Sequence, residues 1–229
     1  MKKYSIVLSL IMVLAIAAPA SAIRYNDNYL PGNGGYTSPY AGAGAIVETF
    51  DGLNDTLTKG WELGGNWDIR NGDVPNVASA PWWTDPIANP AGAKDATWYL
   101  TVPSDLSISP TSATITFGGN AYNYLGLWWG SMDTYNTLEF LDKDGLRVGD
   151  PYTGGTWSDG NGLQADSRTN MYRNFYDMPN FYGIRLISTS YAFEIDNLAV
   201  GYNVVPEPLS AILLGCGLLG LLGVRRKLR

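Results

Sequence analysis

Short runs of alternating apolar and polar residues, separated by Gly, Asn, Asp and Pro, fill the middle of the chain. Residues 114–117 read Thr-Ile-Thr-Phe and residues 193–196 read Phe-Glu-Ile-Asp, which is the two-residue period of a strand with one buried face. Val, Ile, Thr and aromatic residues, which favour strands, are frequent in these runs. The pattern predicts strands at 45–50, 66–70, 97–102, 113–117, 124–129, 137–141, 146–150, 171–175, 182–188 and 192–200.

No part of the body has a sustained 3.6-residue apolar period, so we expect few and short helices. Strands without alternating helices predict an all-β fold, an antiparallel two-sheet β-sandwich of jelly-roll type, with a closed barrel as the alternative. Residues 142–145, Asp-Lys-Asp-Gly, predict a hairpin connection. Residues 71–94 contain four prolines and are expected to form a long surface loop, a kind of segment that often carries function.

The two ends of the chain differ from the body. Residues 1–22 combine Lys2 and Lys3, an apolar run and a small-residue ending at Ala20 and Ala22, which predicts a signal peptide that signal peptidase removes after Ala22. A second apolar run at 209–224 predicts a short transmembrane helix. The basic residues after it should stay on the cytoplasmic side and leave the body outside; they are Arg225, Arg226, Lys227 and Arg229.

The expected organisation therefore has four parts. The signal peptide at 1–22 precedes an irregular arm at 23–44, which is rich in Gly, Tyr and Asn. The sandwich domain follows at 45–204. The last segment, 205–229, holds the second apolar run and the basic end.

A short motif stands directly before the C-terminal apolar run. It consists of Val205, Pro206, Glu207 and Pro208, and its two prolines keep the backbone extended. The motif, the Gly-rich apolar helix and the basic cluster together resemble the PEP-CTERM sorting signal of exported bacterial surface proteins. The resemblance implies processing by the membrane transpeptidase exosortase and transfer to the cell envelope, the cell surface or an exopolysaccharide matrix.

A second resemblance lies within the body. Residues 128–138 contain Trp-Gly-Ser-Met-Asp-Thr-Tyr-Asn-Thr-Leu from position 129 onward, and residues 193–197 read Phe-Glu-Ile-Asp-Asn. The two stretches are similar to a W-G-S-x-D-x-Y-N-x-L group of exosortase-dependent surface proteins. This resemblance supports the expected fold and location, and it assigns no biochemical activity.

Composition and charge exclude several kinds of function. Residues 23–204 carry 9 basic and 20 acidic side chains, a net of −11, which argues against nucleic-acid binding. The chain has no histidine, so Ser-His-Asp catalysis and His-ligated zinc are excluded. Its single cysteine, Cys216, excludes an intrachain disulfide. Paired carboxylates remain the enzymatic route, but no motif selects a pair. We therefore expect no enzyme.

Acidic residues at both ends of the body are candidates for a structural calcium site. Glu48 and Asp51 belong to the first predicted strand region, and Asp196 belongs to the last. The first and last strands of jelly rolls commonly pair, and this arrangement is similar to carbohydrate-binding modules that hold calcium between those strands. Carboxylate and carbonyl oxygens suit calcium. The alternative is a set of solvated acids that accept hydrogen bonds from loop amides.

Aromatic residues are the second candidates, because exposed Trp faces can stack on sugar rings. Trp82 and Trp83 lie in the Pro-rich loop, and Trp129 lies at a strand end. Adjacent Trp128 and Trp129 face opposite sides of their strand, so at most one of them belongs to the core. We expect a structural or adhesive surface protein. A carbohydrate-binding module with a calcium-stabilised jelly roll is the alternative, and a glycan-active enzyme is the least favoured.

Overall fold

The computed structural model describes residues 24–26, 44–51, 57, 59–81, 97–157, 160–164 and 169–202. Within these ranges the protein is all-β, with two antiparallel sheets, no α-helix and one 3₁₀ helix, Gly154–Trp157. None of these residues belongs to a helix that is long and apolar enough to cross a membrane. The signal peptide at 1–22 and the apolar run at 209–224 lie outside the described residues.

The first sheet contains seven strands. In spatial order they are β1 (Arg24–Asn26), β10 (Met171–Tyr176), β7 (Tyr124–Gly130), β12 (Phe193–Gly201), β5 (Trp98–Val102) and β4 (Asp68–Asn71), and β2 (Ile46–Glu48) pairs with β12. The register of β2 places Glu48 opposite Leu198. The expected pairing of the first and last strands of the body is therefore confirmed.

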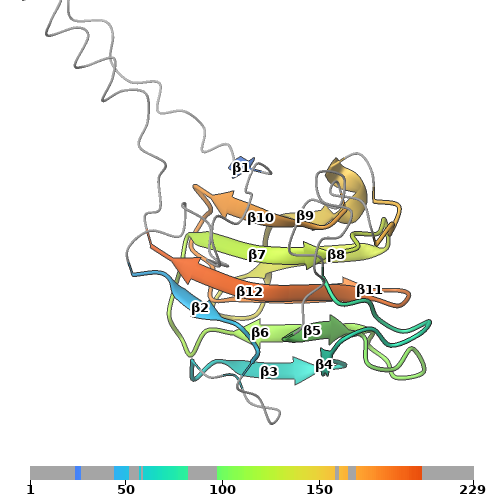
Figure 1. The fold of residues 1–229 in the computed structure, drawn as a ribbon. Helices are drawn as coiled ribbons and strands as arrows, with labels where there is room; N and C mark the ends of the chain where they lie inside the picture. The colour runs from blue at the N-terminus through green and yellow to red at the C-terminus, as the bar shows by residue number, and fades with distance from the viewer. Residues whose placement is uncertain are drawn as a thin grey trace, which may run out of the picture.

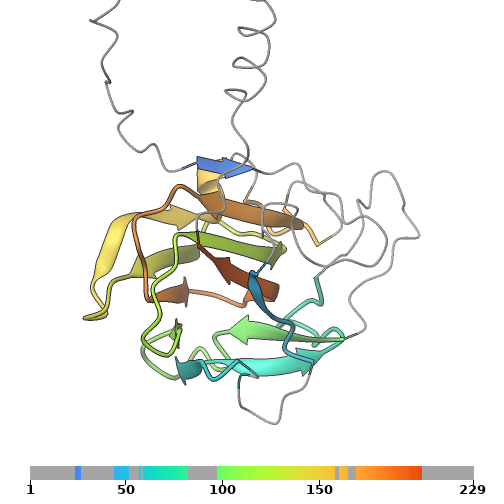
Figure 2. The same ribbon diagram turned by 90° about the vertical axis from the view of Figure 1, so that its left-hand side faces the viewer.

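The second sheet contains five strands. Their order is β3 (Glu62–Gly65), β6 (Ser112–Thr116), β11 (Gly183–Ser188), β8 (Asn136–Leu141) and β9 (Arg147–Thr153). The strands of one sheet lie over those of the other in Figure 1, β7 with β8, β12 with β11 and β5 with β6. The view turned by 90° shows β1 beside β10 at the edge of the first sheet (Figure 2).

All ten predicted strands are present, and the sequence pattern missed two. The strand β3 reads Glu-Leu-Gly-Gly and lacks β-branched residues. A Cβ at Gly65 would collide with the carbonyl oxygen of Ser112, and the φ of +99° at Gly65 favours glycine. The edge strand β3 therefore needs glycine, a residue type that sequence patterns count against a strand. The strand β1 lies in the arm that we expected to be irregular, where pairing with β10 fixes it.

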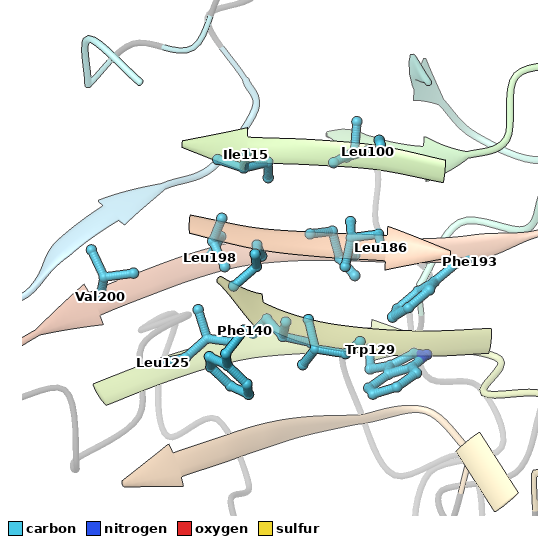
Figure 3. Packing of buried hydrophobic residues seen from close by; sticks show 14 of the residues in the cluster. Leu100, Ile115, Leu125, Trp129, Phe140, Leu186, Phe193, Leu198 and Val200 are labelled. Atoms are coloured by element: carbon cyan, nitrogen blue, oxygen red, sulfur yellow. The ribbon is translucent and has the colours of Figure 1, made fainter. Parts of the chain in front are cut away.

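The apolar core lies between the two sheets. One cluster of buried side chains joins both of them, and the members labelled in Figure 3 are Leu100, Ile115, Leu125, Trp129, Phe140, Leu186, Phe193, Leu198 and Val200. Ring contacts bridge the layers, because Phe140 on β8 lies 5.5 Å from Phe175 on β10, centroid to centroid. The inner faces of the two sheets thus share one apolar core, as in a β-sandwich.

The last strand reverses its alternation midway. The core contains the odd-numbered residues Phe193 and Ile195 from the first half of the strand and the even-numbered residues Leu198 and Val200 from the second half. A bulge between Asp196 and Ala199 accommodates the change, and Asn197 within it has a φ of +50°. Because Phe193 and Ile195 face inward, Glu194 lies on the outer face of the sheet.

The predicted hairpin is also confirmed. Asp142 accepts a backbone hydrogen bond from Gly145 at 3.1 Å, and its own N–H donates to the carbonyl oxygen of Leu146 at 2.8 Å. The carboxylate of Asp142 accepts from the N–H groups of Asp144 and Leu146, both at 2.9 Å. These bonds close the turn between β8 and β9.

Candidate functional site

A pocket of about 390 Å³ lies where four segments of the chain meet beside the outer face of the first sheet. The loop before β5 contributes residues 73–79, and the connection between β7 and β8 contributes Ser131, Asp133 and Tyr135. Further lining comes from Gly162 and Gln164, from Tyr191 and Ala192, and from Glu194 near the start of β12. Pockets of this size hold small ligands.

Glu194 is the most deeply buried acidic residue among the described residues that line the pocket. In the sheet it pairs with Thr101 on β5 and with Gly130 on β7, and only 2 % of it is exposed. Its carboxyl oxygens accept hydrogen bonds from the N–H of Ser79 at 3.0 Å and from the hydroxyl of Ser131 at 2.9 Å. Burial raises the pKa of Glu194 to about 8, and the nearby charge of Asp133 adds to the effect while both hydrogen bonds oppose it. The carboxyl group is therefore protonated at neutral pH.

Asp133 and Tyr135 lie on the neighbouring connection, and both are half-buried. Desolvation raises the pKa of the Asp133 carboxyl, and the adjacent Tyr135 hydroxyl lowers it in part. Burial and the adjacent carboxylate raise the pKa of the Tyr135 phenol. That hydroxyl also lies 2.8 Å from the carbonyl oxygen of Tyr191, to which it donates. The phenol thus stays neutral, and its single hydrogen is donated to the Tyr191 carbonyl oxygen.

Buried amide side chains hold this connection in place. Asn136 accepts from the N–H of Asp133 at 2.8 Å, and its amide donates to the Ser188 hydroxyl at 3.0 Å and the Ala192 carbonyl at 3.1 Å. Asn170 accepts from the N–H of Ser131 at 3.0 Å. These bonds tie the segment that carries Asp133 to the start of β12, which carries Glu194.

Gly162 allows the backbone of its loop to lie close to the Asp133 carboxylate. Gly162 has a φ of +64°, and a Cβ there would collide with the carboxylate of Asp133. Its N–H donates to the carbonyl oxygen of Met132 at 3.0 Å. A side chain at this position would displace Asp133 or the loop.

The described residues that line the pocket offer several kinds of hydrogen-bonding group, and their ionisable carboxyl groups are acidic. Among the residues that the structure describes, the lining of the pocket includes the carboxyl groups of Asp73, Asp133 and Glu194 and no Lys or Arg. Serine hydroxyls, the Tyr135 and Tyr191 phenols and one glutamine amide provide neutral donors and acceptors. Such a surface suits a polar ligand with many hydroxyl groups.

The three acids predicted for calcium each accept a backbone hydrogen bond. Glu48 accepts from the N–H of Phe50 at 3.0 Å, and Asp51 accepts from that of Trp98 at 3.0 Å. Asp196 accepts from the N–H of Asn197 at 2.6 Å. The residues that the structure describes include no group of three or more His, Cys, Asp or Glu placed to hold a metal ion. Calcium stays a prediction.

Trp129 does not lie where a sugar-binding ring would be needed. Its ring is fully buried and stacks on Phe193, with 4.3 Å between centroids (Figure 3). The expectation of a glycan platform at Trp129 is therefore corrected, because its position on β7 turns it inward. Trp82 and Trp83 lie outside the described residues, as do Val205, Pro206, Glu207, Pro208 and the basic cluster.

Sequence reasoning singled out the stretches that build the pocket but did not recognise a site in them. Ser131, Asp133 and Tyr135 belong to the W-G-S-x-D-x-Y-N-x-L stretch, and Glu194 belongs to the later F-E-x-D-N segment. The signal that could have found the site is that each of the two stretches contains an acidic residue among other polar residues, Asp133 in the first and Glu194 in the second. Part of the loop expected at 71–94, residues 73–79, lines the pocket.

No protein-family model and no curated protein matches this chain. Among solved structures, the chain is similar to the enzymatically active domain of tailspike protein 4 from bacteriophage CBA120, with 16% identity and a TM-score of 0.32. The match covers 66% of this chain and 20% of the tailspike chain, so this chain spans about a fifth of that structure's length.

Proposed function

We propose that this chain is an exported surface protein of the cell envelope or extracellular matrix, and that its sandwich binds a glycan in the pocket around Glu194. The observation that carries the glycan part is the pocket itself, which is the size of a small ligand and is lined by carboxyl, hydroxyl, phenol and amide groups. Sugars are bound by groups of this kind, because each hydroxyl both donates and accepts a hydrogen bond. Binding of a matrix polysaccharide would give the protein an adhesive function.

The fold supports this proposal at the level of architecture. Strands β5, β12, β7 and β10 follow one another in the first sheet, and β6, β11, β8 and β9 do so in the second. This is the order of a jelly roll whose eight strands run from β5 to β12, and jelly rolls occur in lectin domains. The sandwich is therefore proposed to be a jelly roll, with β2, β3 and β4 added at its edges and β1 beside β10.

Export and sorting are the second part of the proposal and derive from the ends of the chain. The signal peptide is removed after Ala22, and the tail at 205–229 is recognised by exosortase while the apolar run at 209–224 holds the protein in the membrane. N-terminal sequencing of material from the native host should find Ile23 as the first residue. A chain that still starts at Met1 would contradict export by cleavage.

The glycan part is tested by probing a glycan array with the full-length chain, with calcium and with a chelator. Binding to a defined set of glycans, abolished by Asp133→Asn, would support the pocket as the site. Retention of the same glycans by Asp133→Asn would move the site elsewhere on the protein.

The carboxyl pair favours one further candidate, a glycan-cleaving enzyme. Glu194 is protonated at neutral pH beside the second acid Asp133, and a protonated carboxylic acid paired with a carboxylate is what glycoside hydrolysis needs. Release of new reducing ends from a bound glycan, lost in Glu194→Gln, would establish an enzyme. Intact glycan after prolonged incubation would leave a binding protein.

A further inference from the structure

The described chain enters and leaves the sandwich at the same end of the first sheet. Leu125 on β7 lies opposite Phe175 on β10 and opposite Val200 on β12, so the C-terminal ends of β10 and β12 lie at the same level. Figure 1 shows the arrowheads of these two strands on the same side. The strand β1 begins at Arg24 and pairs with this end of β10, and Tyr202 follows β12. Arg24 and Tyr202 therefore lie at one end of the sandwich.

Both predicted membrane segments are joined to this end by short stretches of chain. Six residues separate Tyr202 from the apolar run at 209–224, and five separate Arg24 from Ala18, where the apolar run of the predicted signal peptide ends. An extended residue spans at most about 3.6 Å, so neither stretch reaches farther than about 25 Å. When either segment lies in a bilayer, this end of the sandwich is the one held near the membrane.

The pocket lies toward the opposite end. Glu194 pairs with Gly130, the last residue of β7, and precedes Gly201 by seven residues along β12. At about 3.3 Å per residue, Glu194 lies roughly 23 Å from Gly201 along the strand. A sandwich whose Gly201 end faces the membrane therefore directs the pocket away from the bilayer.

The end of the sandwich near the predicted membrane segments exposes two side chains suited to a bilayer surface. Ile46 on β2 lies opposite Val200, and 36% of it is exposed. Tyr202 is 58% exposed, and its ring lies 5.1 Å from that of Tyr122, centroid to centroid. Apolar side chains and the amphipathic ring of tyrosine are favoured at the boundary between lipid headgroups and acyl chains. Because residues 23–204 carry a net charge of −11, we expect no attraction to anionic lipids.

We propose that this end of the sandwich docks on the outer surface of the membrane while the chain is anchored, with Ile46 and Tyr202 among the lipid headgroups and the pocket directed outward. The partner is a lipid surface, and the contact needs no anionic lipid. The proposal rests on the export and sorting part of the proposed function and does not depend on what the pocket binds. Two side chains give only marginal affinity, since even a single acyl chain binds membranes reversibly. Removal of the anchor by exosortase would therefore also end the docking.

Quenching of a fluorescent label by lipid measures this contact in the full-length chain. Cys216→Ser removes the single native cysteine, and Ile46→Cys or Tyr202→Cys then introduces one position for the label. The matched controls are Ile108→Cys and Leu163→Cys, because these side chains are 50% and 54% exposed and lie in loops at the pocket end. Each protein is reconstituted into phosphatidylcholine vesicles that contain a spin-labelled lipid with its nitroxide just below the headgroup.

The expected result follows from the separation of the two ends. With roughly 23 Å between them along the strands, labels at positions 46 and 202 should be quenched at least about twofold more than labels at 108 and 163. Flotation of the vesicles on a density gradient shows in the same samples whether the chain is anchored.

A substitution at Tyr202 separates lipid contact from orientation by the anchor alone. Tyr202→Ser should lower the quenching of a label at Ile46→Cys, because serine has no ring to lie among the headgroups. Tyr202→Trp, which keeps an amphipathic ring, should retain the quenching. Leu163→Ser is the control at the pocket end and should leave the label unaffected. Near-UV circular dichroism confirms that each variant is folded.

The outcomes separate docking from the proposed function. If all four labels are quenched equally, or if labels at 46 and 202 stay unquenched in chains that float with the vesicles, docking is overturned and the anchor stands. Unchanged quenching in Tyr202→Ser overturns the lipid contact. If the chain does not float with the vesicles, the prediction of a membrane helix at 209–224 fails, and docking fails with it. Glycan binding by the pocket stands or falls separately from all of these results.

Discussion

Replacing Glu194 with glutamine should change how the stability of the sandwich depends on pH. The pKa of the buried Glu194 carboxyl is about 8 in the folded chain, against an ordinary value of 4.5. Between these two values the folded state binds the proton more tightly than the unfolded state does, so protonation stabilises the fold. The contribution is fully present below pH 4.5 and is lost as the pH rises through 8.

The size of the effect follows from the shift. One pKa unit corresponds to about 1.4 kcal/mol, so the interval from 4.5 to 8 sets a ceiling of about 5 kcal/mol on the stability that the wild type loses. Glutamine has no charge at any of these pH values and keeps a carbonyl oxygen for the N–H of Ser79. We therefore expect the free energy of unfolding of Glu194→Gln, relative to the wild type, to rise by a few kcal/mol from pH 5 to pH 9.

Urea denaturation of the full-length chain provides the measurement, followed by tryptophan fluorescence in mild detergent because a membrane helix is predicted at 209–224. Midpoints and slopes at pH 5, 7 and 9 give the free energy at each pH. Glu62→Gln is the control at an exposed strand position and should run parallel to the wild type. If Glu194→Gln also runs parallel to the wild type, Glu194 is not protonated in the folded chain and the reasoning is refuted.

Three further changes test other parts of the chain. Gly162→Ala should destabilise the fold by roughly 1–2 kcal/mol and weaken ligand binding, because its Cβ meets the Asp133 carboxylate; binding equal to wild type in calorimetry would contradict this. Asp196→Ala should lower the melting temperature more in calcium than in chelator, and an equal loss would show that Asp196 serves the fold without metal. Replacing residues 206–208 with alanines should leave export intact but trap a form about 2 kDa heavier in the membrane fraction, by the mass of some twenty residues. Release of that variant like the wild type, in a host with exosortase, would end the sorting proposal.

Local patterns determined most of the strands. The ten predicted strands are present because runs of β-branched and aromatic residues favour an extended backbone, and this preference depends on residues that are neighbours in the sequence. The turn at 142–145 is local in the same sense, since Asp142 closes it with bonds to residues at most four positions away. The two missed strands, β1 and β3, depend on partners distant in the sequence.

The candidate site shows the limit of such reasoning. The sequence marked the stretches that contain Asp133 and Glu194, yet the two residues are 61 positions apart and become neighbours because β7 and β12 pair. It also proposed Trp129 for a sugar platform, since alternation says that adjacent rings face opposite sides but not which side is the core. Packing against Phe193 decided that.

The sequence by itself thus determined that the body is β-rich, acidic and without histidine or disulfide chemistry, because these follow from composition and short-range periodicity. Only the tertiary structure decided which acids are buried together. The desolvation of a carboxyl group depends on the residues that surround it. The residues that contact the Glu194 carboxyl include Ser79 on one loop and Ser131 on another. In the sequence, Glu194 is one polar position of an alternating strand. In the folded chain it is a buried carboxyl group of a pocket, and its pKa is raised.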